Sequence, residues 1–219
     1  MVLHTLGTRQ VVLEKQGNNM PAVFLVSDTH FGHAGVCRFT ESDGVTKIRP
    51  WTDPHEMDEE MIKRWNDTVR PTDKVYHLGD VVINRKALPT MARLNGDKVL
   101  IRGNHDIFPD VEYSKYFREL RAYHVMNGMI LSHIPLHSDS LGRFGVNIHG
   151  HLHSNRVKKA RGVDARTGEV LYSDEPDVRY HCVCVEQTDF KPILFEDVIK
   201  RIEAEGGSIG FKSGNGPTM

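Results

Sequence analysis

Cysteine is scarce in this chain, and its scarcity excludes a fold built on disulfides. There are three cysteines among 219 residues, and two of them, Cys182 and Cys184, lie two positions apart in a strand-like run. A small secreted domain held together by disulfides carries a larger, even set of cysteines. We therefore expect reduced thiols and a cytoplasmic protein, in which Cys182 and Cys184 are inert strand residues.

Long apolar runs and an excess of charge of one sign are also absent. No run approaches the roughly 20 apolar residues of a membrane-spanning helix. The first residues, MVLHTLGTRQ, lack the positive region and apolar stretch of a signal peptide. The formal net charge is −1, so there is no overall basic field to hold a nucleic-acid backbone. We expect neither a membrane nor a long nucleic acid as partner.

Tryptophan is rare as well, with two residues, whereas histidine is abundant, with 13. Hydrophobic residues make up 39% of the chain and charged residues 26%, as in ordinary globular proteins. A chain of this length can bury one core, and no internal repeat or domain boundary is visible. We expect a single domain over residues 1–205 and a flexible, glycine-rich tail over residues 206–219.

Short apolar runs that alternate with helical patterns predict an α/β fold. One helix is predicted to begin after Asp53, a good N-cap, and to end before Pro71, with an apolar stripe of Met57, Met61 and Trp65. Further helices are predicted over residues 86–94, 110–120 and 194–205. Strands are predicted over residues 10–15, 22–27, 74–78, 98–101, 129–132, 146–149 and 180–186. Residues 31–50 are expected to form a loop over the site, and residues 155–180 an exposed hairpin.

Polar side chains follow five of these apolar runs. They are Asp28 and His30 in VSDTH, Asp80 in HLGD, Asn104, His105 and Asp106 in RGNHD, His133 in LSH, and His151 and His153 in HGHLH. In open α/β sheets, ligand sites gather beyond the carboxyl ends of the strands, so we expect these groups at one edge of one sheet. Carboxylates, imidazoles and an amide are ligands for hard to borderline metals. The sequence therefore predicts a two-metal hydrolase site.

The spacing within the clusters predicts which residues share an ion. Residues two apart in an extended segment point the same way, so Asp28 and His30 are expected to hold one ion, and His151 and His153 to share a side. A glycine lets the chain turn sharply just before Asp80, whose two oxygens could bridge two ions. Two dications and two carboxylates leave two formal positive charges, which suit an anionic phosphate.

The form and order of these motifs resemble those of the calcineurin-like metallophosphoesterase superfamily. The motifs D-x-H, G-D, G-N-H-D, an isolated histidine and G-H-x-H occur in that order within residues 22–190. The run HEMDEEMIKRWNDTVRPTDKVYHLGD is further similar to a group of small bacterial and phage phosphoesterases. The resemblance implies a sandwich of two mixed β-sheets flanked by helices, and a metal-dependent phosphohydrolase.

The resemblance also implies roles for the motif residues. The first ion would be held by Asp28, His30, Asp80 and His153, and the second by Asp80, Asn104, His133 and His151. A hydroxide that bridges the two ions would attack phosphorus. His105 would contact the phosphate and protonate the leaving oxygen, and Asp106 would orient the loop or His105. Manganese is the expected metal, with iron, nickel and zinc as alternatives.

Residues beside the motifs have open roles. Arg38 and Arg102 could bind the phosphate of the substrate, or each could form a surface ion pair. The basic stretch over residues 156–166 could face a nucleotide or simply be a solvated hairpin. Four further histidines could contact substrate, support a metal ligand or pack in the core, namely His33, His77, His137 and His149.

We expect the substrate to be a small phosphodiester or phosphomonoester, nucleotide-like in character. Ile83 and Asn84 stand where the protein Ser/Thr phosphatases of the superfamily have Asp and Arg, which disfavours a phosphoprotein substrate. One alternative is a DNA or RNA nuclease of the superfamily, but the nucleases usually carry a capping domain, for which about 30 residues after the last strand are too few. Another is a non-catalytic scaffold such as the retromer subunit with this fold, but scaffolds lose ligands that this sequence retains.

Overall fold

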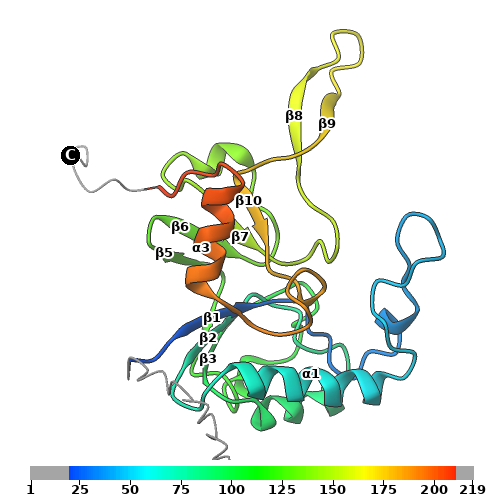
Figure 1. Cartoon of the computed structure of the whole chain (residues 1–219), viewed down its shortest axis with the longest axis vertical. Helices are drawn as coiled ribbons and strands as arrows, with labels where there is room; N and C mark the ends of the chain where they lie inside the picture. Colours follow the sequence, from blue (N-terminus) through cyan, green and yellow to red (C-terminus); the bar gives the residue numbers. More distant parts are fainter. Residues whose placement is uncertain (1–19, 211–219) are drawn as a thin grey trace, which may run out of the picture.

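Two larger β-sheets, a two-stranded hairpin and the helices around them make up the computed structural model, which describes residues 20–210 (Figure 1). The strands are β1 (Val23–Val26), β2 (Lys74–His77), β3 (Asp97–Ile101), β4 (Glu119–Arg121), β5 (His124–Met126), β6 (Met129–Ser132), β7 (Asn147–His149), β8 (Lys158–Val163), β9 (Val170–Pro176), β10 (Tyr180–Cys182) and β11 (Ile193–Leu194). The α-helices are α1 (Pro54–Thr68), α2 (Asp110–Tyr113) and α3 (Phe195–Ala204). The 3₁₀-helices are η1 (Val36–Arg38), η2 (Arg85–Arg93), η3 (Ser138–Leu141) and η4 (Val185–Gln187). The strand predicted over residues 10–15 lies outside the described residues.

The motif loops come from two sheets, not from the single sheet predicted from the sequence. The first sheet has the order β11-β1-β2-β3-β4, with β1 to β4 parallel and β11 antiparallel. The second has the order β10-β7-β6-β5, with β5 antiparallel to β6 and the other pairs parallel. The expected sandwich of two mixed sheets is thus confirmed. Parallel strands end at a common edge, so the loops after them meet.

Helix α1 covers the outer face of the first sheet, below the strands in Figure 1. Asp53 caps it by accepting a hydrogen bond from the backbone N–H of His55 over 3.0 Å, as its sequence predicts. Met57, Met61 and Trp65 are buried against this face. Each such side chain contributes about 1.5–3 kcal/mol when it leaves water, so the stripe fixes the helix to the sheet.

The second core lies between the sheets. Alternation along β1 puts Phe24 and Val26 into the core under α1, and Leu25 into the core between the sheets. Leu131 of β6 and Val198 of α3 belong to that same second core, so α3 closes it at the side. After α3, Ile209 packs against this core, whereas residues 211–219 of the predicted tail lie outside the described residues.

The predicted helix over residues 110–120 is wrong beyond its first turn. Helix α2 ends at Tyr113, and the chain then enters β4, where Leu120 pairs with Leu100 of β3. The apolar spacing of Tyr113 and Phe117 suggested a helix, and both side chains are buried. The next residues instead pair with the edge strand of the sheet and form a strand. The strand predicted over residues 180–186 likewise ends at Cys182, before η4.

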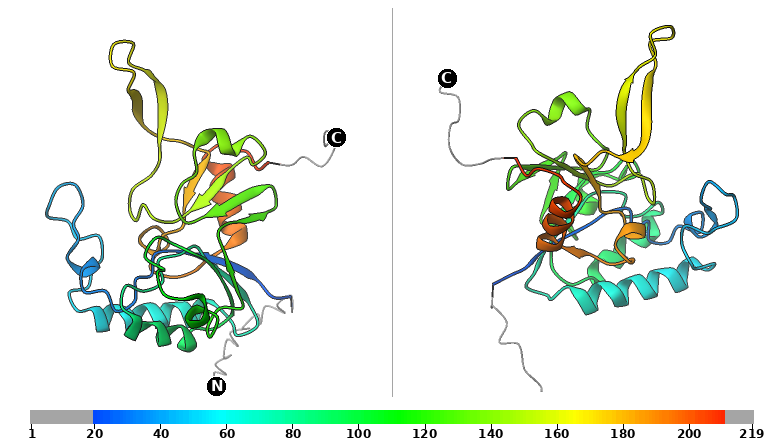
Figure 2. Two further views of the ribbon diagram at one scale, coloured as in Figure 1. Left: turned by 180° about the vertical axis from the view of Figure 1, so that it is seen from behind. Right: turned by 45° about the horizontal axis from the view of Figure 1, so that its top comes forward.

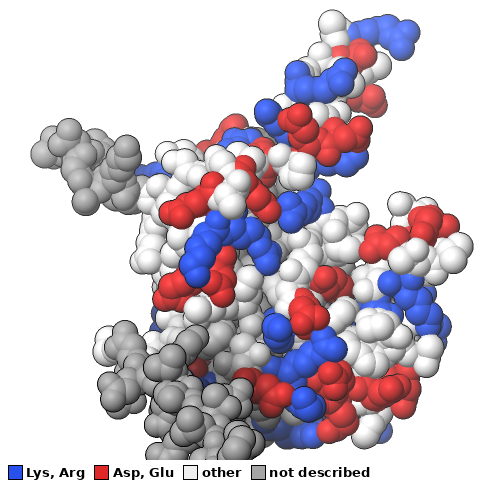
Figure 3. Space-filling model, in the orientation of Figure 1, with Lys and Arg blue, Asp and Glu red and all other residues white. Residues whose placement is uncertain are grey.

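The predicted hairpin is present as β8 and β9, which project from the body of the molecule (Figure 2). Two of its basic side chains are paired with acidic ones across the hairpin. Lys158 Nζ lies 3.2 Å from Asp174 Oδ1, and Lys159 Nζ lies 3.8 Å from Glu175 Oε2, so basic side chains of β8 face acidic side chains of β9. Figure 3 shows the two signs of charge interleaved along it.

Candidate metal centre

The loops at the ends of β1, β2, β6 and β7 bring two groups of potential metal ligands together. Within each group the ligand atoms lie within 4.8 Å of one another. The groups are Asp28, His30 and His153, and Asp80, His133 and His151. Both groups draw residues from both sheets, so the site is built across the edge of the sandwich.

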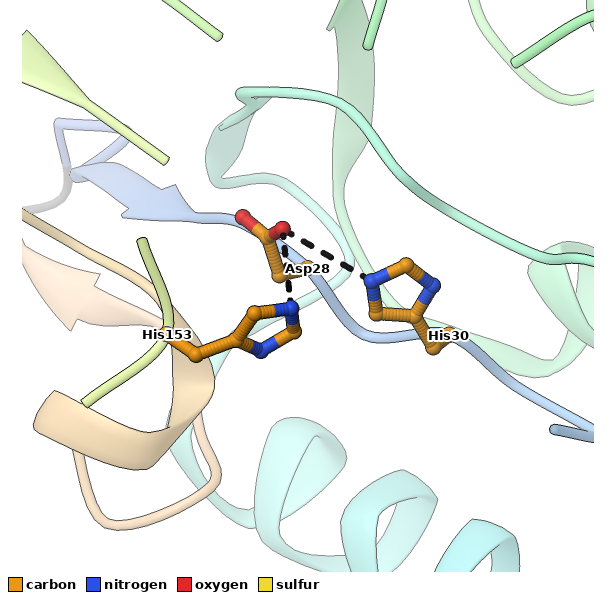
Figure 4. Close-up of side chains that lie close together, drawn as sticks. All are labelled: Asp28, His30 and His153. Atoms are coloured by element: carbon orange, nitrogen blue, oxygen red, sulfur yellow. Dashed lines mark ion pairs between the residues drawn. The ribbon is translucent and has the colours of Figure 1, made fainter. Parts of the chain in front are cut away.

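The first group centres on one oxygen of Asp28 (Figure 4). Asp28 Oδ1 lies 3.7 Å from His30 Nε2 and 3.9 Å from His153 Nε2. The carboxylate and the ring of His30 are buried. Asp28 Oδ1 and both ring nitrogens of His30 have no hydrogen-bond partner among residues 20–210.

The other oxygen of Asp28 is fully engaged. Asp28 Oδ2 accepts hydrogen bonds from Ser27 Oγ at 2.5 Å, from the backbone N–H of His151 at 2.8 Å, and from Cys184 Sγ at 3.1 Å. These donors fix the carboxylate and turn Oδ1 toward the histidines. Burial alone would raise the pKa of Asp28, but its partners, His30 above all, hold that pKa well below its usual value. The carboxylate is therefore anionic.

Asp80 belongs to the second group and also faces the first. Its Oδ2 is 3.7 Å from His30 Nε2 of the first group and 3.4 Å from His133 Nε2 of the second. Gly79, with φ of +93°, makes the turn that the sequence predicts, and a Cβ there would overlap the backbone of Gly103. One carboxylate oxygen thus faces both groups.

The amide of Asn104 lies beside the second group. His133 Nε2 lies 2.9 Å from Asn104 Oδ1, and its Nδ1 lies 2.7 Å from the carbonyl oxygen of Leu78, to which it donates. The ring of His151 packs edge-on to that of His133, with centroids 5.2 Å apart. Burial lowers the pKa of His151. Burial also opposes protonation of His133, but the hydrogen bond and charge of Asp80, together with the charge of Asp28, raise the pKa of His133.

Five of these residues adopt a left-handed backbone. At four of them, Asp28, His30, His151 and His153, this corrects the extended geometry predicted from the sequence. The φ angles are 59° at Asp28, 48° at His30, 58° at Asp80, 70° at His151 and 52° at His153. Side chains two apart therefore converge through tight turns and not through strand alternation. Non-glycine residues rarely adopt this conformation, and such strain concentrates at functional sites.

The donor set fits divalent metal ions. Buried polar atoms without partners are costly, and here a carboxylate oxygen and imidazole nitrogens without partners face one another. A cation between them would satisfy both kinds of atom at once. Nitrogen and oxygen donors of this kind suit first-row divalent metals.

His105 and Asp106 follow Asn104 on the same loop but differ in burial. Asp106 is buried and accepts hydrogen bonds from three backbone N–H groups, those of Asp80 at 2.8 Å, Val81 at 3.0 Å and Gly103 at 2.8 Å. It therefore ties the two motif loops together. His105 is exposed, and its ring centroid lies 5.7 Å from that of His30.

The two arginines singled out in the sequence have different surroundings. Arg102 donates to the carbonyl oxygens of Asp106 and Phe108 and pairs with Asp110, so its guanidinium already binds its own loop. Arg38 is exposed at the end of η1. A contact of either residue with substrate stays a prediction.

The four neighbouring histidines differ in environment. Burial lowers the pKa of His77 to about 3 and that of His33 to about 4. His77 packs near Trp65 in the core, and the ring of His33 lies 5.7 Å from that of His30. Two more serve local structure: His137 accepts from a backbone N–H at the start of η3, and His149 lies against a backbone carbonyl.

Sequence analysis missed Arg49 and Glu186, which lie directly behind the first group. Arg49 is fully buried, and the Glu186 side chain is 2% exposed. Glu186 Oε1 is 2.9 Å from His153 Nδ1 and 2.8 Å from Arg49 Nε. Neither residue belongs to a motif, and only their burial as a pair reveals them. The cysteines are all free, but Cys184 contacts Asp28, so it is closer to the site than expected.

No helix within residues 20–210 combines the length and apolarity needed to cross a bilayer. Among known proteins, the chain is 32% identical over 193 residues to the uncharacterized protein MJ1445 of Methanocaldococcus jannaschii, covering 84% of this chain and 93% of the relative.

Among solved structures, the fold is similar to that of AQ665 from Aquifex aeolicus, a protein of unknown function, with a TM-score of 0.56 and 25% identity over 83% of this chain and 100% of that one. An archaeal phosphodiesterase aligns over 70% of this chain and 83% of its own with 18% identity and a TM-score of 0.37. The model of the calcineurin-like phosphoesterase family matches residues 22–200, and the chain therefore belongs to that family.

Proposed function

We propose that this protein binds two divalent ions and hydrolyses a small phosphodiester or phosphomonoester of nucleotide-like character. The observation that supports this most directly is the position of Asp80, whose Oδ2 faces a histidine of each ligand group, at 3.7 Å and 3.4 Å. A single carboxylate between two sets of nitrogen and oxygen donors suits a pair of ions that share a ligand.

In this proposal Asp28, His30, Asp80 and His153 hold one ion. The other ion is held by Asp80, Asn104, His133 and His151. When bound, two such ions supply an activated water and neutralise charge on the phosphoryl group. Manganese is the proposed metal, with iron, nickel and zinc as alternatives.

The residues on the Asn104 loop act on the substrate. Exposed at the rim of the site, His105 contacts the phosphoryl group and donates a proton to the leaving oxygen, which needs one unless it is a weak base. Asp106 keeps His105 and Asp80 in register through its three backbone hydrogen bonds. Arg38 is free to approach an anionic substrate, whereas Arg102 would have to exchange one of its own contacts.

A hollow of about 310 Å³ opens beside Asn104 and His133, and its size supports the proposal of a small substrate. Its wall includes Ala122, Ile134 and Leu136, so it offers apolar surface next to the second ligand group. That volume suits the organic part of a small ester. The balanced charge of the β8–β9 hairpin provides no basic track for a long polyanion.

The test is hydrolysis by protein loaded with manganese and compared, at equal phosphodiester concentration, on a small nucleotide diester, an aryl diester and duplex DNA. We expect turnover of the small esters and about two ions per chain by elemental analysis. Efficient cleavage of the duplex without turnover of any small ester would favour the nuclease alternative. Absence of metal under saturating manganese would refute the two-ion site.

A further inference from the structure

We propose that Glu186 and Arg49 are positioning residues for the first ion, through the orientation of His153 and of the Asp28–His30 loop. Neither residue is among the eight proposed metal contacts, and the inference rests on the proposed metal site. The inference predicts that the negative charge of Glu186 strengthens binding of the first ion, although Glu186 does not touch the metal. The affinity of the second ion should not depend on this charge.

The contact between Glu186 and His153 defines which nitrogen faces the site. Glu186 Oε1 lies 2.9 Å from His153 Nδ1, so Nδ1 carries the hydrogen and donates it to the carboxylate. The lone pair then resides on Nε2, the atom that faces Asp28 Oδ1 at 3.9 Å. A carboxylate on the far nitrogen of a metal-binding histidine fixes the ring and makes it a stronger donor.

Arg49 extends this control to the other two ligands of the group. Its Nη2 donates to the carbonyl oxygen of Asp28 at 2.6 Å, and its Nη1 to that of Thr29 at 2.9 Å. Its Nε and Nη2 reach Glu186 Oε1 at 2.8 Å and 2.7 Å. One guanidinium therefore joins the turn between Asp28 and His30 to the carboxylate behind His153.

The burial of this pair argues for more than packing. A fully buried ion pair gains little over an apolar pair of similar volume, because both charges lose their water. Here the anion has one oxygen, Glu186 Oε2, without a hydrogen-bond partner among the described residues, while Oε1 serves His153 and Arg49 together. The carboxylate of Glu186 therefore orients His153 and Arg49 through one oxygen, while its other oxygen makes no hydrogen bond within the described residues.

The decisive variant is Glu186→Gln, which keeps the size and one acceptor oxygen of the side chain but removes its charge. Metal-free protein is titrated with manganese, and bound ions are followed by electron paramagnetic resonance, which separates single ions from coupled pairs. We expect one ion to bind about 10- to 100-fold more weakly and the other to keep its affinity. Equal, wild-type affinities for both ions would overturn the proposal.

A double variant, Arg49→Met with Glu186→Met, removes the acceptor without leaving a buried charge unpaired. It should weaken the same ion, whereas a purely structural pair would lower the melting temperature and leave the ratio of the two affinities unchanged. Glu205→Gln is the matched control, because Glu205 Oε2 lies 3.5 Å from Nδ1 of His181, a histidine that is not among the proposed metal ligands. It should change neither affinity. A wild type that binds two ions but cleaves no ester would refute the proposed function without touching this inference.

Discussion

The backbone N–H of His105 donates a hydrogen bond to Oδ1 of Asp80 over 2.9 Å. The proposed proton donor is therefore anchored by its main chain to the residue that faces both ligand groups. The other oxygen of Asp80 stays directed at His30 and His133. Because the anchor is a backbone group, the His105 side chain can be removed without disturbing it.

Replacing His105 by alanine should keep both ions and slow hydrolysis by roughly 10²–10⁴-fold on esters with poor leaving groups. The loss should be smaller for a nitrophenolate, which leaves without a proton. Rates on the two ester classes and metal content by elemental analysis check this. Loss of an ion in the variant would show that His105 had been misassigned.

Much of the fold and the order of the site residues follow from local sequence. The N-cap at Asp53 and the stripe of Met57 and Trp65 locate α1 because short-range contacts decide it. The turn before Asp80 is likewise local, since it depends on Gly79. Polar residues directly after apolar strands point to a shared edge, so the convergence of these residues could be predicted. Their division into two ion-binding sets came from the family resemblance.

The features that could not be predicted depend on long-range contacts. Arg49 and Glu186 are separated by 137 positions and belong to no motif, so nothing in the sequence pairs them. The end of α2 depends on the edge of a sheet that accepts Leu120 beside Leu100. The carboxylate of Asp28 receives hydrogen bonds from His151 and Cys184, which are distant in sequence, so its orientation could not be predicted from local sequence.

Replacing Asp80 by asparagine should abolish hydrolysis and weaken both ions, because one neutral amide cannot serve two cations as a carboxylate does. The fold should survive, since the side chain lies at the end of β2 and not in either core. Metal titration and circular dichroism of the same sample separate these effects. An active, folded variant with two bound ions would contradict the shared-ligand assignment.

Replacing Arg49 by methionine should lower the free energy of unfolding by about 3–5 kcal/mol, because Glu186 would be left as an unpaired buried charge. Arg93 is the matched control: it pairs with Glu59 at 2.6 Å, but the two side chains are 51% and 44% exposed. Water screens that pair, so its loss should fall within the error of urea denaturation. Equal losses of unfolding free energy at both positions would mean that the burial of Glu186 adds no cost when Arg49 is removed.

Replacing His77 by asparagine should make stability less sensitive to acid. Burial lowers the pKa of His77 to about 3 in the folded chain, against 6.5 for the free group, so the unfolded chain binds more protons between those values. The contribution of His77 to stability therefore falls as the pH drops below 6.5, by at most about 1.4 kcal/mol per pH unit. The neutral ring accepts the N–H of Gly79 at Nδ1 and lies 3.0 Å from Thr29 Oγ1 at Nε2, and an asparagine oxygen can take over the first contact without titrating.

Urea denaturation of metal-free protein across this pH range measures both slopes, and every other titrating group is common to the two proteins. The variant will be less stable near neutral pH because its smaller side chain leaves a cavity, yet its slope should be shallower. Parallel slopes would mean that His77 is protonated in the folded state as readily as in the unfolded chain.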